Sequence, residues 1–193
     1  MASLFTKDEK RQLLAIARGA ILQQVTTGAA QPITVANEKL QAHLGCFVSI
    51  KMDGKLRGCI GNFIADKPLY LLVQEMAIAA ATRDPRFYPM KRNDLENFSI
   101  EISVLSPLQQ ITSIEEIKVG THGIYMERNF HRGVLLPQVA TELGWDRETF
   151  LQQTALKAGM GRDDWQENTD ISIFSADVFN DIEIRPLQPK KRS

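Results

Sequence analysis

Two runs of β-prone residues flank the dipeptide Asp53-Gly54, and this stretch constrains the fold more than any other part of the chain. Aspartate followed by glycine tolerates the two positive φ angles of a type I′ turn, so residues 46–61 are predicted to form a β-hairpin. With a two-residue turn, the pairs predicted on one face are Met52 with Lys55, Ile50 with Arg57, Val48 with Cys59 and Cys46 with Gly61. The hairpin therefore predicts an antiparallel sheet.

Arg57 and Cys59 are predicted to be neighbours on that face of the hairpin. A fixed cation within several ångströms favours the thiolate, which is the reactive form of cysteine. The adjacent Gly58 lets a backbone or a ligand approach closely. Cys59 is therefore a candidate nucleophile or ligand, with Arg57 and Gly58 as candidate binding residues. The alternative is a small, buried cysteine beside an arginine that forms a structural ion pair.

Further candidates lie outside the hairpin. Glu101 lies within an alternating strand, where it could pair with Arg57 or Arg86, or could be solvated on the outer face. His122 precedes a strand and could act as a base or ligand, or could be a turn histidine bonded to the backbone. Asp84 and Arg86 lie in a loop dense in charge and aromatic residues, which could bind an anionic or planar group or be pinned by ion pairing.

The composition excludes several classes of function. The 193 residues are 44% hydrophobic, which is enough for a substantial core, and 23 basic side chains balance 23 acidic ones, so no nucleic-acid partner is predicted. No apolar run reaches the ~18 residues of a membrane span, and the start lacks the layout of a signal peptide, so cytoplasmic residence is predicted. The two cysteines are expected to be reduced, and the histidines and cysteines show no zinc-binding spacing, so no metal is predicted.

Hairpins dominate the predicted elements. Thr6, Asp66 and Asp146 are predicted to cap helices that end before Gly28, at Asp84-Pro85 and before Gly159. Strands are predicted at residues 98–105, at 124–128 and 133–136 as a second hairpin, at 171–179 and at 182–184. Because strands and helices mix without a βαβ rhythm, a largely antiparallel α+β fold is predicted.

Several motifs in order along the chain resemble those of one known family. They are Leu56-Arg57-Gly58-Cys59-Ile60-Gly61, Asp84-Pro85-Arg86-Phe87, Glu101-Ile102-Ser103-Val104-Leu105, His122-Gly123 and Leu135-Leu136-Pro137-Gln138-Val139-Ala140, with Trp145 and Phe150-Leu151 after them. Together they resemble the AMMECR-type domain, over residues 11–179. The six-residue cysteine motif is highly specific to that family.

The resemblance implies an α+β fold with a larger lobe, built on an antiparallel sheet flanked by helices, and a smaller lobe with a short sheet. Residues 1–185 would form this single two-lobed domain, and residues 186–193 a disordered tail. The resemblance also implies that Arg57, Gly58, Cys59, Glu101 and His122 line a cleft between the lobes. The family has no settled activity or cofactor, but its microbial members are often encoded beside a Memo-like protein and a radical-SAM protein. The implied function is a cleft that uses Cys59 in a pathway shared with these partners, and the alternative is a non-enzymatic binding or scaffold module for them.

Overall fold

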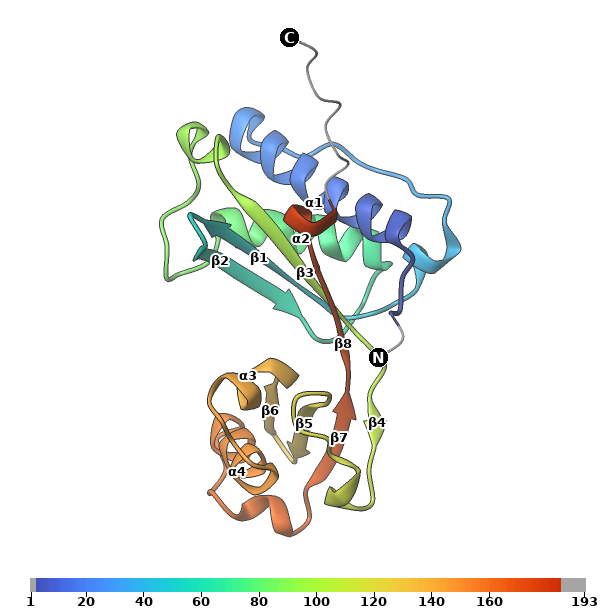
Figure 1. The fold of residues 1–193 in the computed structure, drawn as a ribbon, viewed down its shortest axis with the longest axis vertical. Helices are drawn as coiled ribbons and strands as arrows, with labels where there is room; N and C mark the ends of the chain where they lie inside the picture. The colour runs from blue at the N-terminus through green and yellow to red at the C-terminus, as the bar shows by residue number, and fades with distance from the viewer. Residues whose placement is uncertain (1–2, 185–193) are drawn as a thin grey trace. The chain divides into compact units, whose positions relative to one another are not determined.

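The computed structural model describes residues 3–184, which divide into two compact units (Figure 1). Unit 1 combines the residues up to Val104 with those from Asp177 onward, and unit 2 is the stretch Leu105–Ala176. Each unit has its own four-stranded sheet and its own hydrophobic core. The predicted α+β class, with two sheets flanked by helices, is confirmed. The predicted tail, residues 186–193, lies outside the described residues.

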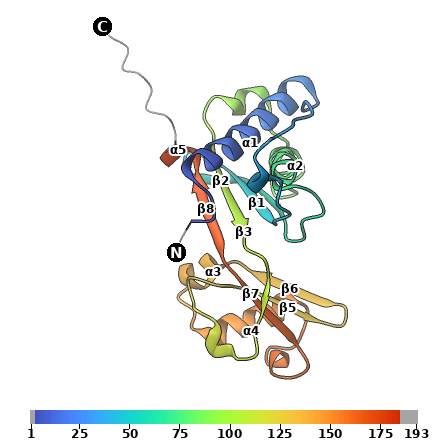
Figure 2. The same ribbon diagram turned by 90° about the vertical axis from the view of Figure 1, so that its right-hand side faces the viewer.

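Unit 1 packs two long helices on one face of its sheet (Figures 1 and 2). The strand order is β2-β1-β3-β8, with β1 antiparallel to both β2 and β3. Its elements are α1 (Lys7–Thr27), β1 (Cys46–Met52), β2 (Lys55–Asn62), α2 (Leu69–Thr82), β3 (Ser99–Leu105), β8 (Ala176–Asn180) and α5 (Asp181–Ile184), with short 3-10 helices at Glu38–Gln41 and Arg92–Leu95. The predicted strand at residues 182–184 is therefore wrong, because these residues form the short helix α5.

Helix boundaries follow local chemistry in unit 1. Thr6 caps α1 in a reciprocal capping box with Glu9, and the helix ends at Gly28, whose φ is 82°, as predicted. The prediction that Asp66 caps α2 is wrong. Pro68 occupies the N-cap position with an extended ψ of 142°, so the helix begins only at Leu69.

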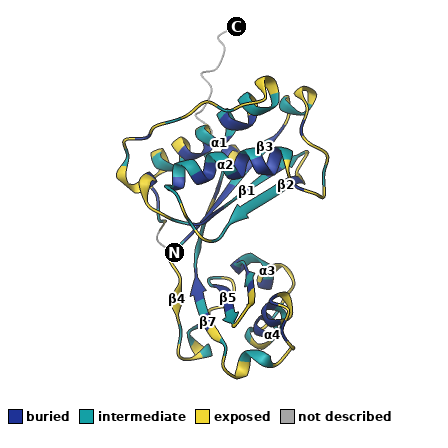
Figure 3. Cartoon of the chain, turned by 180° about the vertical axis from the view of Figure 1, so that it is seen from behind, coloured by how far each residue is buried: buried dark blue, intermediate teal, exposed yellow. Residues whose placement is uncertain are grey.

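Side chains of β1 and β3 alternate between two faces of the sheet. The face toward α1 and α2 is buried and apolar. Figure 3 shows buried residues along both helices and along the strands that these helices cover. The opposite face, called here the polar face, is marked by Ser49, Lys51, Ser99 and Glu101, all partly exposed. The alternation predicted for β3 is confirmed, since Ile100, Ile102 and Val104 are fully buried and Glu101 lies on the other face.

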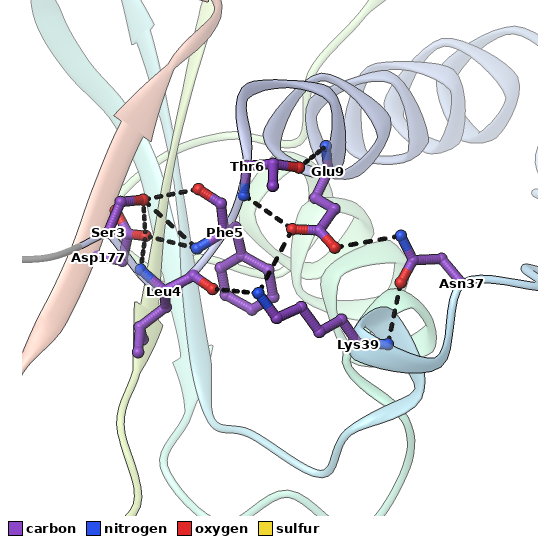
Figure 4. A network of polar contacts seen from close by, with 8 residues as sticks. All are labelled: Ser3, Leu4, Phe5, Thr6, Glu9, Asn37, Lys39 and Asp177. Atoms are coloured by element: carbon purple, nitrogen blue, oxygen red, sulfur yellow. Dashed lines mark hydrogen bonds and ion pairs between the residues drawn. The ribbon is translucent and has the colours of Figure 1, made fainter.

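The N-terminal segment is attached to β8 by a polar network (Figure 4). The Asp177 carboxylate accepts hydrogen bonds from Ser3 Oγ and Leu4 N, both at 2.8 Å, and from Lys10 Nζ at 2.6 Å. Burial raises the pKa of Asp177, but the hydrogen bonds from Lys10 and Ser3 outweigh it, so the pKa lies below its ordinary value. Residues far apart in sequence are thus fixed together in unit 1.

Unit 2 places two helices beside a second antiparallel sheet of order β4-β7-β5-β6. Its elements are β4 (Gln109–Gln110), β5 (Gly123–Arg128), β6 (His131–Leu135), α3 (Pro137–Glu142), α4 (Arg147–Lys157) and β7 (Asp170–Phe174), with 3-10 helices at Ile114–Glu116 and Asp164–Gln166. The predicted second hairpin is confirmed, although its turn is only Asn129-Phe130 because Arg128 pairs with His131. Asp146 caps α4 by accepting a hydrogen bond from Thr149 N at 2.8 Å.

Candidate functional site

The β1–β2 hairpin contains a bulge that changes its register. The turn is Asp53-Gly54, with φ angles of 50° and 74°, and Met52 faces Lys55 as predicted. Arg57 is then the extra residue of a β-bulge, and the pairs beyond it are Ile50 with Gly58, Ser49 with Cys59, Val48 with Ile60 and Cys46 with Asn62. The predicted pairs of Ile50 with Arg57, Val48 with Cys59 and Cys46 with Gly61 are therefore wrong.

The shifted register places the two cysteines on opposite faces of the sheet. Cys59 faces Ser49 on the polar face and is partly exposed, and Ser49 in turn faces Glu101 on β3. Cys46 points into the core and is fully buried, and this burial raises the pKa of its thiol to about 12. Both thiols are free.

A row of polar side chains crosses three strands at Cys59. The Ser49 hydroxyl donates a hydrogen bond to Cys59 Sγ at 3.2 Å. The main-chain N–H of Cys59 points away from β1, so Cys59 and Ser49 form a non-hydrogen-bonded pair of the antiparallel ladder. The Cα atoms of such a pair lie about 4.5 Å apart, which brings their side chains together. Beyond Ser49, Glu101 forms an ion pair with Lys51 at 2.9 Å. Glu101 thus pairs with Lys51 and not with the arginines considered from the sequence.

The loop after α2 covers the outer edge of β2 at Cys59. The Cys59 N–H donates to Asp84 Oδ2 at 2.8 Å, and Arg86 Nη2 lies 3.4 Å from the Cys59 carbonyl oxygen. Arg86 also forms a two-pronged ion pair with Asp84, from Nε to Oδ1 at 3.0 Å and from Nη2 to Oδ2 at 2.8 Å. The Arg86 hydrogen bond, with those from the Cys59 and Arg86 main chain, holds the pKa of Asp84 well below its ordinary value despite burial.

Arg57 makes its contacts with the same loop, not with the thiol. Its Nη2 donates to the Tyr88 carbonyl oxygen at 2.8 Å and lies 3.5 Å from Asp94 Oδ2, and its guanidinium stacks 4.2 Å from the centre of the Tyr88 ring. Arg57 is only 8% exposed. Arg86, in contrast, interacts electrostatically with Cys59. The Asp84 carboxylate is the main cause that raises the pKa of the Arg86 guanidinium, and Cys59 makes a smaller contribution in the same direction.

Gly58 has a packing role that the sequence did not suggest. A Cβ atom at this position would lie 2.1 Å from the main-chain oxygen of Ala80. Only glycine therefore lets β2 approach α2 this closely. The backbone that approaches Gly58 closely is therefore that of α2 in the same chain.

His122 belongs to unit 2, whereas Cys59 and Glu101 belong to unit 1. Its Nδ1 lies 3.1 Å from the Glu116 carbonyl oxygen and 3.3 Å from the Lys118 main-chain nitrogen, as in the turn histidine considered as an alternative. The ring borders a cavity of about 100 Å³ within unit 2, formed also by Ser106, Pro107, Gln109, Ile173, Phe174 and Ser175.

Two residues of the site were missed in the sequence. Ser49 and Lys51 alternate with the buried positions of β1, so their position on one face was readable from the pattern. Only the register of the bulged hairpin shows that this face is the one that carries Cys59. Among residues 3–184, no cluster of three histidine, cysteine or acidic side chains could hold a metal ion. None of the helices in that range has the length and hydrophobicity of a membrane span.

The AMMECR1 family model matches residues 14–179 of this chain. A protein of Methanothermobacter thermautotrophicus is 40% identical over 186 residues, which cover 91% of this chain and 96% of that protein. A protein of Methanopyrus kandleri is 38% identical over 193 residues, which cover 95% and 93%. The crystal structure of an uncharacterized protein from Pyrococcus horikoshii matches with a TM-score of 0.82 and 35% identity over 92% of this chain and 93% of the other. The chain belongs to the AMMECR1 family.

Proposed function

We propose that this protein acts through the thiol of Cys59, as the nucleophile or ligand for a small or modified substrate. The observation that carries the proposal is a partly exposed cysteine, whose sulfur accepts a hydrogen bond from Ser49 at 3.2 Å and whose main-chain N–H is held by Asp84 at 2.8 Å. A reactive thiol needs both access and a rigid setting. Cys59 meets both conditions, whereas Cys46 is sealed in the core.

The neighbouring side chains supply groups for proton transfer. Glu101 and Lys51 form an ion pair at 2.9 Å in the same row of the polar face as Cys59. Because Ser49 lies between them and Cys59, these two groups would exchange protons with a substrate bound at the thiol and not with the thiol itself. His122 is a separate candidate within unit 2, where Nδ1 binds the main chain and Nε2 makes no hydrogen bond to a described residue. Nε2 is therefore the ring nitrogen left to contact a ligand.

The cellular setting is a proposal that rests on the family resemblance. We infer that the protein works in the cytoplasm, in a pathway shared with a radical-SAM protein and a Memo-like protein. The free thiols of Cys46 and Cys59 are consistent with a reducing compartment.

The test compares two strains, each with one cysteine changed to alanine in the chromosomal gene. The Cys59→Ala strain should reproduce the growth and metabolite profile of a gene deletion, while the purified variant unfolds at the wild-type temperature. Cys46→Ala should keep function, because its thiol is enclosed in the core. The proposal would be overturned if the deletion strain differs from the wild type in growth or metabolites but the Cys59→Ala strain does not.

The rival is a binding or scaffold module without chemistry. Leu56 is 42% exposed and Tyr88 59% exposed, next to the buried Arg57, and they supply apolar surface for a partner. On this account, Leu56→Ser and Tyr88→Ser abolish co-purification of the radical-SAM and Memo-like proteins, whereas Cys59→Ala changes neither binding nor function. Ile64→Ser, at a side chain 65% exposed on the same unit, is the control.

A further inference from the structure

Arg86 is held as a rigid donor group beside Cys59. Asp84, only 4% exposed, fixes one edge of the guanidinium through the bonds from Nε at 3.0 Å and Nη2 at 2.8 Å. The Nη2 atom also reaches the Cys59 carbonyl oxygen at 3.4 Å. Both N–H groups of Nη1 remain without a hydrogen bond to any described residue, on a side chain that is 56% exposed. The guanidinium is therefore fixed through Nε and Nη2, and its Nη1 group is available to a ligand.

The surroundings of this arginine are basic, in a chain without net charge. Residues 83–98, between α2 and β3, hold four basic and three acidic side chains, and Arg57 adds a fifth basic group against the same loop. The carboxylate of Asp84 is committed to Arg86, and that of Asp94 lies 3.5 Å from Arg57. These two acidic groups therefore serve to orient arginines, and the excess charge is positive.

We propose that the Cys59 site takes an anionic substrate, whose carboxylate or phosphate group binds Nη1 of Arg86 beside the thiol. The N–H groups of a guanidinium form charge-assisted hydrogen bonds with the oxygens of either group. Asp84 offsets part of the charge of Arg86 but removes its rotational freedom, so recognition depends on fixed geometry. The inference rests on the proposed function and specifies its substrate class.

Two alkylating probes of nearly equal size test the inference. Iodoacetate and iodoacetamide both form a carbon–sulfur bond with the thiolate and release iodide, but only iodoacetate carries a negative charge. The buried Cys46 does not compete in the folded protein. The ratio of the iodoacetate rate to the iodoacetamide rate should be roughly two- to threefold higher at Cys59 than for free cysteine, less than for an isolated unit charge because Asp84 offsets part of the charge of Arg86. Mass spectrometry identifies the labelled residue.

Substitutions assign the preference to Arg86. Arg86→Gln should lower the ratio to that of free cysteine. Arg86→Lys should give an intermediate value, because lysine keeps the charge but cannot form the two-pronged ion pair with Asp84 that fixes Arg86. Arg83→Gln, at an exposed arginine of the same loop, should leave the ratio unchanged. If Arg86→Gln fails to fold, Arg86→Lys and the wild-type ratio still decide.

Protection of wild-type Cys59 from iodoacetamide distinguishes the two sources of anion. Protection by inorganic phosphate alone assigns a phosphate substrate, and protection by acetate alone assigns a carboxylate. A wild-type ratio equal to that of free cysteine overturns the inference. If Cys59→Ala is nevertheless inactive in the cell, only the substrate class is wrong, whereas a fully functional Cys59→Ala strain removes the proposed function itself.

Discussion

The buried carboxylate of Asp84 accepts hydrogen bonds from the main chain of Cys59 and from three N–H groups of Arg86. Its folded-state pKa lies below its value in the unfolded chain. The carboxylate therefore contributes stability that is present above about pH 4, the ordinary pKa of aspartate, and is lost as the pH falls toward the folded-state pKa. One side chain thus couples the position of the thiol to the stability of unit 1.

Asp84→Asn should lower the free energy of unfolding by about 2 kcal/mol at pH 7, because the Arg86 guanidinium and the buried main-chain N–H of Cys59 lose a charged acceptor. The difference from the wild type should shrink at pH 3, because the unfolded wild-type chain then binds a proton at Asp84 while the folded protein still keeps this carboxylate ionised. Urea unfolding at both pH values measures this. Asp66→Asn, at an exposed aspartate of the same unit, is the control. An equal loss at both pH values would contradict the assigned role of the charge.

The sequence predicted Asp84 and Arg86 as site candidates because charge and aromatic residues are concentrated in their loop. It did not predict that Arg86 lies at Cys59 while Arg57 packs against Tyr88. That exchange depends on the bulge at Arg57. The adjacent Gly58 is its trace in the sequence, but a glycine within a strand indicates either a bulge or a close backbone approach and does not fix the register.

At the scale of elements, β2 lies in close contact with α2 where both are made of small residues. The main-chain oxygen of Ala80 occupies the space that a Cβ at Gly58 would need, at 2.1 Å. The alternation of β3 was readable because one face is purely apolar, and the capping of α1 was readable because Thr6 and Glu9 stand at the required spacing. The approach of β2 to α2 is a tertiary contact, which periodicity does not encode.

Gly58→Ala should therefore destabilise unit 1 by about 2 kcal/mol, since the strand and helix must move apart. The same change at Gly19, where an added Cβ meets no atom within 4 Å, should stabilise α1 by about 0.5–1 kcal/mol through higher helix propensity. Thermal unfolding of the two variants compares them directly. The two changes in stability are expected to have opposite signs. Equal signs would show that the space between β2 and α2 at Gly58 does not exclude a side chain.

At the scale of the whole molecule, unit 1 depends on residues that follow unit 2 in the chain. Phe179 is buried in the core of unit 1, and Asp181 bonds both Arg18 and the main chain of Ile100. The division into two lobes entered the sequence analysis only through the family resemblance. Periodicity alone does not reveal that the last strand returns to the first unit.

A chain that stops after Ala176 keeps all of unit 2 but loses β8 and α5. We expect Cys46 to become reactive in native buffer, because the core of unit 1 loses Phe179, while fluorescence from Trp145 and Trp165, both in unit 2, stays at its full-length value. A chain that stops after Ile184 retains both elements and should behave as the full chain does. Continued protection of Cys46 in the shorter chain would contradict this dependence.

The proposed function requires that the Cys59 thiol on the polar face is accessible to reagents while the buried Cys46 thiol is not. Brief exposure of the native protein to N-ethylmaleimide, followed by peptide mass spectrometry with and without denaturant, measures this difference. We expect Cys59 to be labelled within the pulse and Cys46 to be labelled only after denaturation. Protection of Cys59 to the same degree as Cys46 would show that its thiol is not available for chemistry.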